Sequence, residues 1–175
     1  MTQNEFLERS RYYLAYEYPT KIRLAVEAVD ETVIWKRANE ESNSIGNLVL
    51  HLCGNARQWI VCGVGGAVST RDRDAEFAQR ETIERDRLLS LLRTTIADVD
   101  STLRNLIPQL HDPQTLLERR TIQGSDVDVL EAIFHVTEHF SMHTGQIIML
   151  TKMLTGSDMR FYDFSAGAPR HDWHA

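Results

Sequence analysis

The sequence has few of the features that mark exported, membrane-spanning or nucleic-acid-binding proteins. None of its apolar runs is long enough for a transmembrane helix, and its first residues lack the basic and apolar segments of an export signal. Lysine and arginine (19) are fewer than aspartate and glutamate (25), which gives a formal net charge of −6. This sign is wrong for neutralising phosphates. We therefore expect a cytoplasmic protein with neither nucleic acid nor a membrane as partner.

Cysteine and glycine are also scarce, and their positions limit the architecture. The spacing of the two cysteines, Cys53 and Cys62, fits no common zinc knuckle, and a lone pair in a reducing compartment favours free thiols over a disulfide. None of the nine glycines lies between Gly66 and Gly124, which leaves room for long helices. With 42% hydrophobic and 25% charged residues, the chain has the composition of a single globular domain, 1–175.

Apolar residues recur with helical spacing, and no segment shows the alternation of a strand. Pro19 suits the first turn of one helix, Ser42 or Ser44 can cap a second, and Ser125 with Asp128 resembles a capping box. The predicted helices are residues 19–33, preceded by a shorter aromatic segment over 6–16, then 45–62, 82–107 and 125–155. Four amphipathic helices around one core predict an all-α four-helix bundle with a long connection.

Histidines on the last predicted helix are the first candidates for chemistry. His135, His139 and His143 lie four residues apart, on adjacent turns. His143 occupies a position where the apolar period requires a core residue, and His139 lies at the edge of the same stripe. A pair of histidines at i and i+4 is a common way for one helix to present two nitrogens to a metal ion. His135 lies further round the helix, where a supporting or surface role is expected.

A third ligand is offered by the second predicted helix. His51 lies there among apolar residues, and Asn55 follows one turn later on the same face, where it could orient a bound ligand. Three histidines from two helices would leave one position of a tetrahedral metal site open, which is the catalytic rather than the structural pattern. The residues alone leave one alternative, a polar core bridged by water.

Two other classes of metal enzyme do not fit the pattern. A zinc peptidase would need glutamate directly after His139, but Phe140 stands there. A ferritin-like di-iron site needs two Glu-x-x-His pairs, whereas Glu131 precedes His135 by four residues and Glu138 is adjacent to His139. Glu138 is instead a candidate for orienting a ligand or solvent, or it faces solvent.

Further side chains are candidates for binding a substrate. Arg71 and Arg73 stand close together in an acidic chain and could bind the carboxylates of an anionic thiol or substrate. Alternatively, they form salt bridges with acidic neighbours in the same loop. Trp59 and Tyr162 are candidates for pocket walls, although aromatic residues at such spacing also fill cores.

Two segments together carry a family resemblance. Asn43–His51 (NSIGNLVLH) followed by His135–Gln146 (HVTEHFSMHTGQ) resembles the DinB-like superfamily and its YfiT-type metalloenzymes, over nearly the whole chain. The resemblance implies a four-helix bundle with a long crossover connection, often a homodimer. It also implies that His51, His139 and His143 bind a divalent metal ion, commonly zinc or nickel.

The resemblance extends to a function. Members with known chemistry are thiol-dependent, among them bacillithiol S-transferases and mycothiol-dependent maleylpyruvate isomerases. It therefore implies a metal-dependent transferase that acts on a small-molecule thiol and an electrophilic substrate. A metal ion would supply a nucleophilic thiolate at neutral pH. Two alternatives stay open: a non-catalytic metal-binding stress or interaction module on the same bundle, and a metal-assisted hydrolase.

Overall fold

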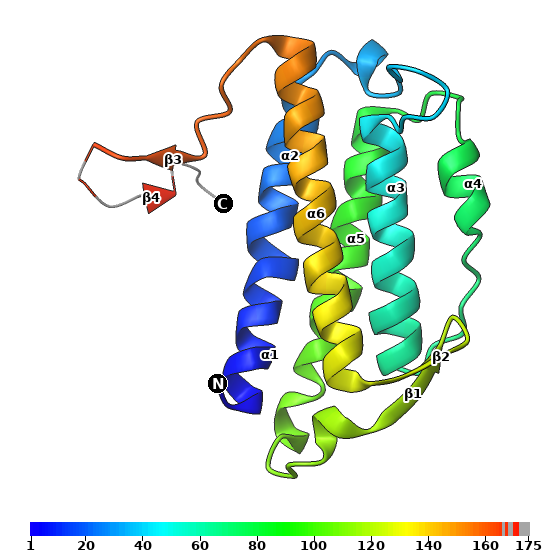
Figure 1. The fold of residues 1–175 in the computed structure, drawn as a ribbon, viewed down its shortest axis with the longest axis vertical. Coiled ribbons are helices and arrows are strands. Elements are labelled where there is room, and N and C mark those ends of the chain that lie inside the picture. Colours follow the sequence, from blue (N-terminus) through cyan, green and yellow to red (C-terminus); the bar gives the residue numbers. More distant parts are fainter. Residues whose placement is uncertain (166, 168–169, 172–175) are drawn as a thin grey trace.

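The computed structural model describes residues 1–165, 167 and 170–171 and is mostly helical (Figure 1). Helix α1 (Gln3–Tyr12) passes through a π-helical turn, Tyr13–Glu17, directly into α2 (Tyr18–Ala28). Pro19 thus lies in the first turn of α2, as predicted, but the preceding aromatic segment is helical and continuous with α2. The wider π-helical turn ends just before the proline, which has no N–H to donate and would interrupt a regular α-helix.

The second long helix begins where the sequence predicts. The Ser44 side chain accepts a hydrogen bond from the backbone N–H of Asn47 at 3.1 Å, and Asn47 Oδ1 accepts from the N–H of Ser44 at 3.2 Å. This reciprocal cap opens α3 (Ile45–Ala56) and identifies Ser44, rather than Ser42, as the N-cap. A second π-helical segment, Arg57–Val64, extends α3 to the glycines that were expected to end it.

The crossover between α3 and the next long helix is more ordered than predicted. It contains the short helix α4 (Arg73–Ala78), capped by Asp72, whose carboxylate accepts from the N–H of Ala75 at 3.0 Å. Helix α5 (Arg85–Arg104) follows and is shorter at both ends than the predicted 82–107. Three short 3₁₀ turns complete the helical structure: Glu31–Val33, Ile107–Gln109 and Thr115–Leu117.

The chain also contains strands, so the prediction of an all-α protein is wrong in detail. Strands β1 (Arg119–Ile122) and β2 (Ser125–Asp128) form an antiparallel hairpin whose turn places Gln123 and Gly124 at positive φ. A second pair, β3 (Tyr162–Asp163) and β4 (Arg170–His171), follows the last helix. The predicted capping box at residues 125–128 is thus a strand.

The last helix, α6 (Val129–Thr155), is capped by Asp128 alone, whose side chain accepts from the N–H of Glu131 at 2.7 Å. It ends at Gly156, which adopts the left-handed conformation that suits glycine. Helix α6 packs against both α2 and α3, and α5 packs against the same two helices from behind (Figure 1). None of the described helices is long and apolar enough to cross a membrane.

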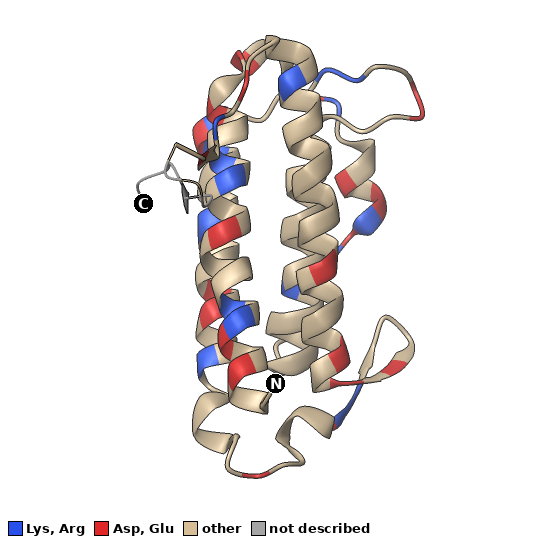
Figure 2. Cartoon of the chain, turned by 60° about the vertical axis from the view of Figure 1, so that its left-hand side comes forward, with Lys and Arg blue, Asp and Glu red and all other residues tan. Residues whose placement is uncertain are grey.

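The core lies between these four helical segments. Leucine, isoleucine and phenylalanine side chains from all of them are fully buried, among them Leu14, Ile22, Leu52, Leu88, Ile133 and Phe140. Cys53 is buried and Cys62 partly buried, and both are free thiols, as predicted. Charged residues lie on the outward faces of the helices and on the loops (Figure 2).

Candidate metal centre

The structure brings the three predicted ligands together. His51 extends from α3, and His139 and His143 extend from adjacent turns of α6. The Nε2 atoms of His51 and His139 are 2.8 Å apart, and one ring nitrogen from each of the three residues lies within 4.8 Å of the others. We call these three residues the histidine cluster. It is formed by the packing of α3 against α6, two helices far apart in the sequence.

The outer nitrogens of two of these rings are held by hydrogen bonds. His51 Nδ1 lies 2.9 Å from Glu76 Oε2, and His143 Nδ1 lies 2.6 Å from Gln146 Oε1. Oxygens of this kind accept hydrogen bonds, so these two contacts favour the tautomer in which Nδ1 carries the proton and Nε2 keeps its lone pair. This is the tautomer in which a histidine can bind a metal through Nε2, with a hydrogen-bonded oxygen fixing the ring. Arg71 Nη2, a donor, also lies 3.2 Å from His51 Nδ1.

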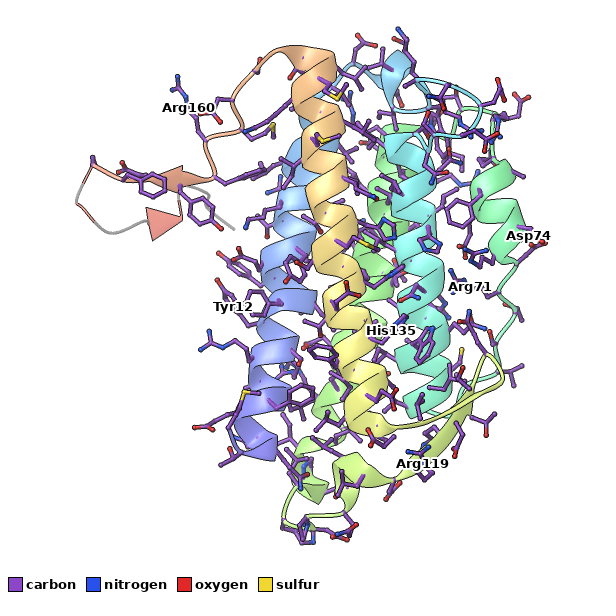
Figure 3. The ribbon with its side chains drawn as sticks, in the orientation of Figure 1. Tyr12, Arg71, Asp74, Arg119, His135 and Arg160 are labelled. Carbon is purple, nitrogen blue, oxygen red and sulfur yellow. The ribbon has the colours of Figure 1, made fainter. Side chains whose placement is uncertain are left out.

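Glu76 is in turn held by Arg71, which is labelled beside α3 in Figure 3. The guanidinium donates through Nε to Oε1 at 2.7 Å and through Nη2 to Oε2 at 2.8 Å, and its Nη1 donates to Gln58 at 2.9 Å. Burial acts to raise the pKa of the Glu76 carboxyl, but the bonds from Arg71 and His51 outweigh it and lower that pKa. Glu76 is therefore a carboxylate fixed between an arginine and a candidate metal ligand.

The backbone leaves room for this carboxylate at one glycine. A Cβ atom on Gly54 would lie 1.8 Å from Glu76 Oε1 and 2.9 Å from Arg71 Nε. Asn47, buried in the first turn of α3, holds the other side of α4 by donating to the backbone carbonyl of Glu76 at 2.9 Å. Helix α4 is thus clamped against α3 so that Glu76 reaches His51.

Burial and mutual repulsion disfavour protonation of the two histidines of the cluster that lie on α6, His139 and His143. Burial, with smaller contributions from the neighbouring His143 and His51, lowers the pKa of His139 to about 3. Burial also lowers the pKa of His143. Neutral imidazoles are the form that binds a divalent metal, so the donor set, its tautomers and its electrostatics all fit such an ion.

Asn55, Trp59 and His135 lie directly beside the histidine cluster, and we call them the flanking cluster. Asn55 Nδ2 donates to His135 Nε2 at 3.2 Å, and the rings of Trp59 and His135 are in contact, tilted by 34° with centroids 4.1 Å apart. The rings of His135 and His139 are nearly parallel, with centroids 5.4 Å apart. The structure therefore places two of the predicted candidates, Asn55 and Trp59, next to the site.

The remaining candidates lie further away or are engaged elsewhere. Arg71 is taken up by Glu76, one of the loop pairings that the sequence left open. The exposed Arg73 lies over the ring of Phe77, 4.9 Å from its centroid, and Glu138 is exposed on α6. Tyr162 is on β3 and accepts a hydrogen bond from Lys21 of α2 at 2.7 Å, on the side of α2 away from α3 (Figure 1).

Sequence reasoning missed Glu76 and Gln146 as partners of the ligands. Gln146 lies three residues after His143 on the same helix, a spacing at which side chains meet, so the signal was present. Glu76 lies 25 residues after His51, in a segment that has no apolar stripe. Its only signal was the charged pattern around Arg71, which by itself indicates a solvated loop.

Comparisons with known proteins identify solved structures of similar fold and a matching protein family. Solved structures of a mycothiol-dependent maleylpyruvate isomerase, and of a histidine-to-alanine mutant of that enzyme, each align with a TM-score of 0.58 at 19% sequence identity. Each alignment covers 83% of this chain and 67% of the other, and the similarity is one of fold. No curated protein matches the chain. A family model described as a protein of unknown function, DUF1572, matches residues 2–168, and the chain therefore belongs to the DUF1572 family.

Proposed function

We propose that this chain is a divalent-metal-dependent enzyme of the DinB-like type, a four-helix bundle with a long crossover, that activates a small thiol for reaction with an electrophile. One observation carries the proposal. One ring nitrogen from each residue of the histidine cluster lies within 4.8 Å of the others, while Glu76 and Gln146 contact the outer nitrogens of two of the rings. A purely structural polar core would not need three imidazoles facing one another.

The residues favour particular metals and a particular chemistry. Imidazole nitrogens suit zinc and nickel, and His51, His139 and His143 would hold the ion. When bound, such an ion supplies Lewis acidity, which lowers the pKa of a thiol or a water that reaches it. The name of the similar solved enzyme includes mycothiol, which supports a thiol as the nucleophile here.

The chain's own residues orient the ligands and exclude water. Glu76, held by Arg71, keeps the His51 ring in position, and Phe77 covers the same ring with centroids 4.5 Å apart. In the reaction, the thiol sulfur forms a bond to the electrophilic carbon, the leaving group departs with its electron pair, and the thiol proton passes to solvent. The homodimer and the cytoplasmic location stay predictions.

The test is a comparison of metal content and thiol turnover. Wild-type protein purified from zinc- and nickel-supplemented cultures should contain about one metal ion per chain, because the described residues form one three-histidine group. It should accelerate conjugation of small thiols with 1-chloro-2,4-dinitrobenzene, and a chelator should abolish that activity. His139→Ala should lose both metal and activity, whereas His111→Ala, which changes an exposed loop histidine, should keep both.

Three results would count against the proposal. A folded protein that contains no metal after growth in supplemented medium would contradict it. Turnover unaffected by chelator or by His139→Ala would contradict the role of the histidine cluster. Metal-dependent hydrolysis of an ester and amide panel, without thiol conjugation, would instead support the hydrolase alternative.

A further inference from the structure

The polar surface between α3 and α6 extends beyond the histidine cluster. On α3, Asn55 and Trp59 follow His51 at intervals of four residues, and on α6 His135 precedes His139 by four. The two rows face each other, because Asn55 donates to His135 and the Trp59 ring contacts the His135 ring. A ligand that reaches the histidine cluster therefore has the flanking cluster as its next neighbour.

The flanking cluster contains two buried polar atoms that find no hydrogen-bond partner within the described part of the chain. These are Asn55 Oδ1, an acceptor, and Trp59 Nε1, a donor. Their residues are only 4% and 7% exposed. Buried polar groups are almost always paired, since leaving one unpaired costs stability, so each such pair of atoms calls for an explanation.

A bound ligand can supply both missing partners. His135 is only half-buried, so the flanking cluster is not sealed from solvent. A secondary amide has one N–H donor and one carbonyl acceptor on the same planar group, and these complement Asn55 Oδ1 and Trp59 Nε1 respectively. An ester offers a poorer match, because it has a carbonyl acceptor but no donor.

We infer that Asn55, Trp59 and His135 form a subsite for a secondary amide carried by the thiol that enters the histidine cluster. The inference rests on the proposed function, since it assigns the part of the thiol that lies beyond the sulfur. The amide N–H donates to Asn55 Oδ1, and Trp59 Nε1 donates to the amide carbonyl. The subsite thereby selects amide-containing thiols over simple ones.

Matched small thiols test this inference by calorimetric titration of the zinc-loaded protein. N-acetylcysteamine has the amide, 2-mercaptoethyl acetate replaces its N–H by an ester oxygen, 3-mercaptopropionate has a carboxylate, and 2-mercaptoethanol has none of these groups. Because one hydrogen bond is worth about a fivefold change in affinity, the amide should bind roughly fivefold more tightly than the ester. Its preference over 2-mercaptoethanol should be larger still.

Variants separate the two proposed hydrogen bonds. Trp59→Phe keeps an aromatic ring and should weaken N-acetylcysteamine and the ester equally, by about fivefold, with 2-mercaptoethanol unchanged. Asn55→Ala should abolish the preference for amide over ester. Trp35→Phe is the matched control, because Trp35 Nε1 donates to the Ile83 carbonyl at 3.1 Å, away from the flanking cluster, and it should alter no thiol affinity.

The outcomes distinguish this inference from the proposed function. Equal affinity of the amide and the ester in the wild type, or a preference for the amide that survives Asn55→Ala, would overturn the subsite but leave the thiol-binding site intact. Tightest binding of 3-mercaptopropionate would show that the flanking cluster presents two donors, with the Asn55 amide reversed, and would also overturn it. If zinc-loaded protein binds none of the four thiols, the proposed function itself fails.

Discussion

Two buried polar clusters of the molecule have opposite electrostatic character. The first, which we call the Glu17 cluster, lies on the helix α1–α2. Glu17 Oε1 accepts from Lys21 Nζ at 2.6 Å, Glu17 Oε2 accepts from the hydroxyl of Tyr12 at 3.0 Å, and Lys21 also donates to Tyr162 of β3. Within the described residues, the negative Glu17 and the positive Lys21 pair directly, so this cluster contains a counter-charge of its own.

The histidine cluster is buried to a similar degree but has no such balance. Its three rings face one another, and Glu76, the carboxylate that contacts His51, is already bound by Arg71. Protonation is disfavoured at His139 and His143. The contrast teaches that this fold pairs buried charges internally where they serve stability, and leaves lone pairs converging where an external cation can bind.

Removing one imidazole should produce the largest effect on this contrast. In His139→Ala only two candidate ligands are left, so zinc affinity should fall by more than the roughly 100-fold that marks the loss of a ligand's hydrogen-bonding partner. Competition with a chromophoric chelator measures it. Substituting His135, which lies beside the cluster but is not one of the three, with alanine should keep stoichiometric zinc. Equal loss in both variants would contradict the assignment of ligands.

Breaking the Glu17 cluster should act on stability instead. Glu17→Gln leaves Lys21 charged, with a side chain only 12% exposed, so the free energy of unfolding should fall by about 3 kcal/mol. Glu27→Gln is the matched control on the same helix. It removes an exposed pair with Arg23 and should cost less than about 0.5 kcal/mol. Urea titration measures the free energy of unfolding of both variants, and neither should change zinc affinity. Similar losses of stability in the two variants would contradict the role assigned to the Glu17 cluster.

The position of the histidine cluster could be predicted because it follows helical periodicity. His143 falls where α6 needs a core residue, and it is buried, as is His51 on α3. The cap at Ser44 was also visible, since a serine followed three residues later by Asn47 is a local signal. These features depend on residues within one helix.

The features that the sequence did not reveal depend on contacts between distant segments or on weak local patterns. Strands β1 and β2 are four residues each, with only Ile122 and Val127 buried, too few to show alternation. The approach of Glu76 to His51 depends on the missing Cβ of Gly54, which has meaning only once α4 packs on α3. The continuation of α1 past Pro19 depends on a π-helical turn, for which composition offers no signal.

A smaller effect is expected from the partner of His51. In Glu76→Gln the carboxylate is lost while the shape is kept, so zinc affinity should fall by about 10- to 100-fold. Glu138→Gln is the control, because Glu138 is adjacent to His139 in the sequence but exposed, and it should leave zinc affinity unchanged. The same chelator competition reports both. If Glu138→Gln had the larger effect, the supporting carboxylate would have been assigned wrongly.

The smallest expected effect is on how the stability of the metal-free protein depends on pH. This effect again distinguishes the histidine cluster from the Glu17 cluster. The pKa of His139 is about 3 in the folded state and about 6.5 when unfolded, so between these values the unfolded chain binds more protons. Stability should therefore fall as pH drops from 6.5 towards 3. The loss should be modest because the ring is only half-buried, and His139→Gln should reduce it.

The Glu17 cluster should lose stability at the other end of the pH range. Burial and the hydrogen bond to Glu17 raise the pKa of Tyr12 to about 12. For Lys21, burial acts to lower the pKa, but the hydrogen bonds to Glu17 and Tyr162 outweigh burial and raise it. Both groups favour the protonated form when folded, so their contribution holds at neutral pH and is lost as pH rises from about 10 through these raised values. Thermal melts of metal-free wild type, His139→Gln and Tyr12→Phe across pH 4–11 measure the loss of stability at acidic and at alkaline pH. Tyr12→Phe should reduce only the alkaline loss. A variant that reduced both losses would show that the two clusters are not independent.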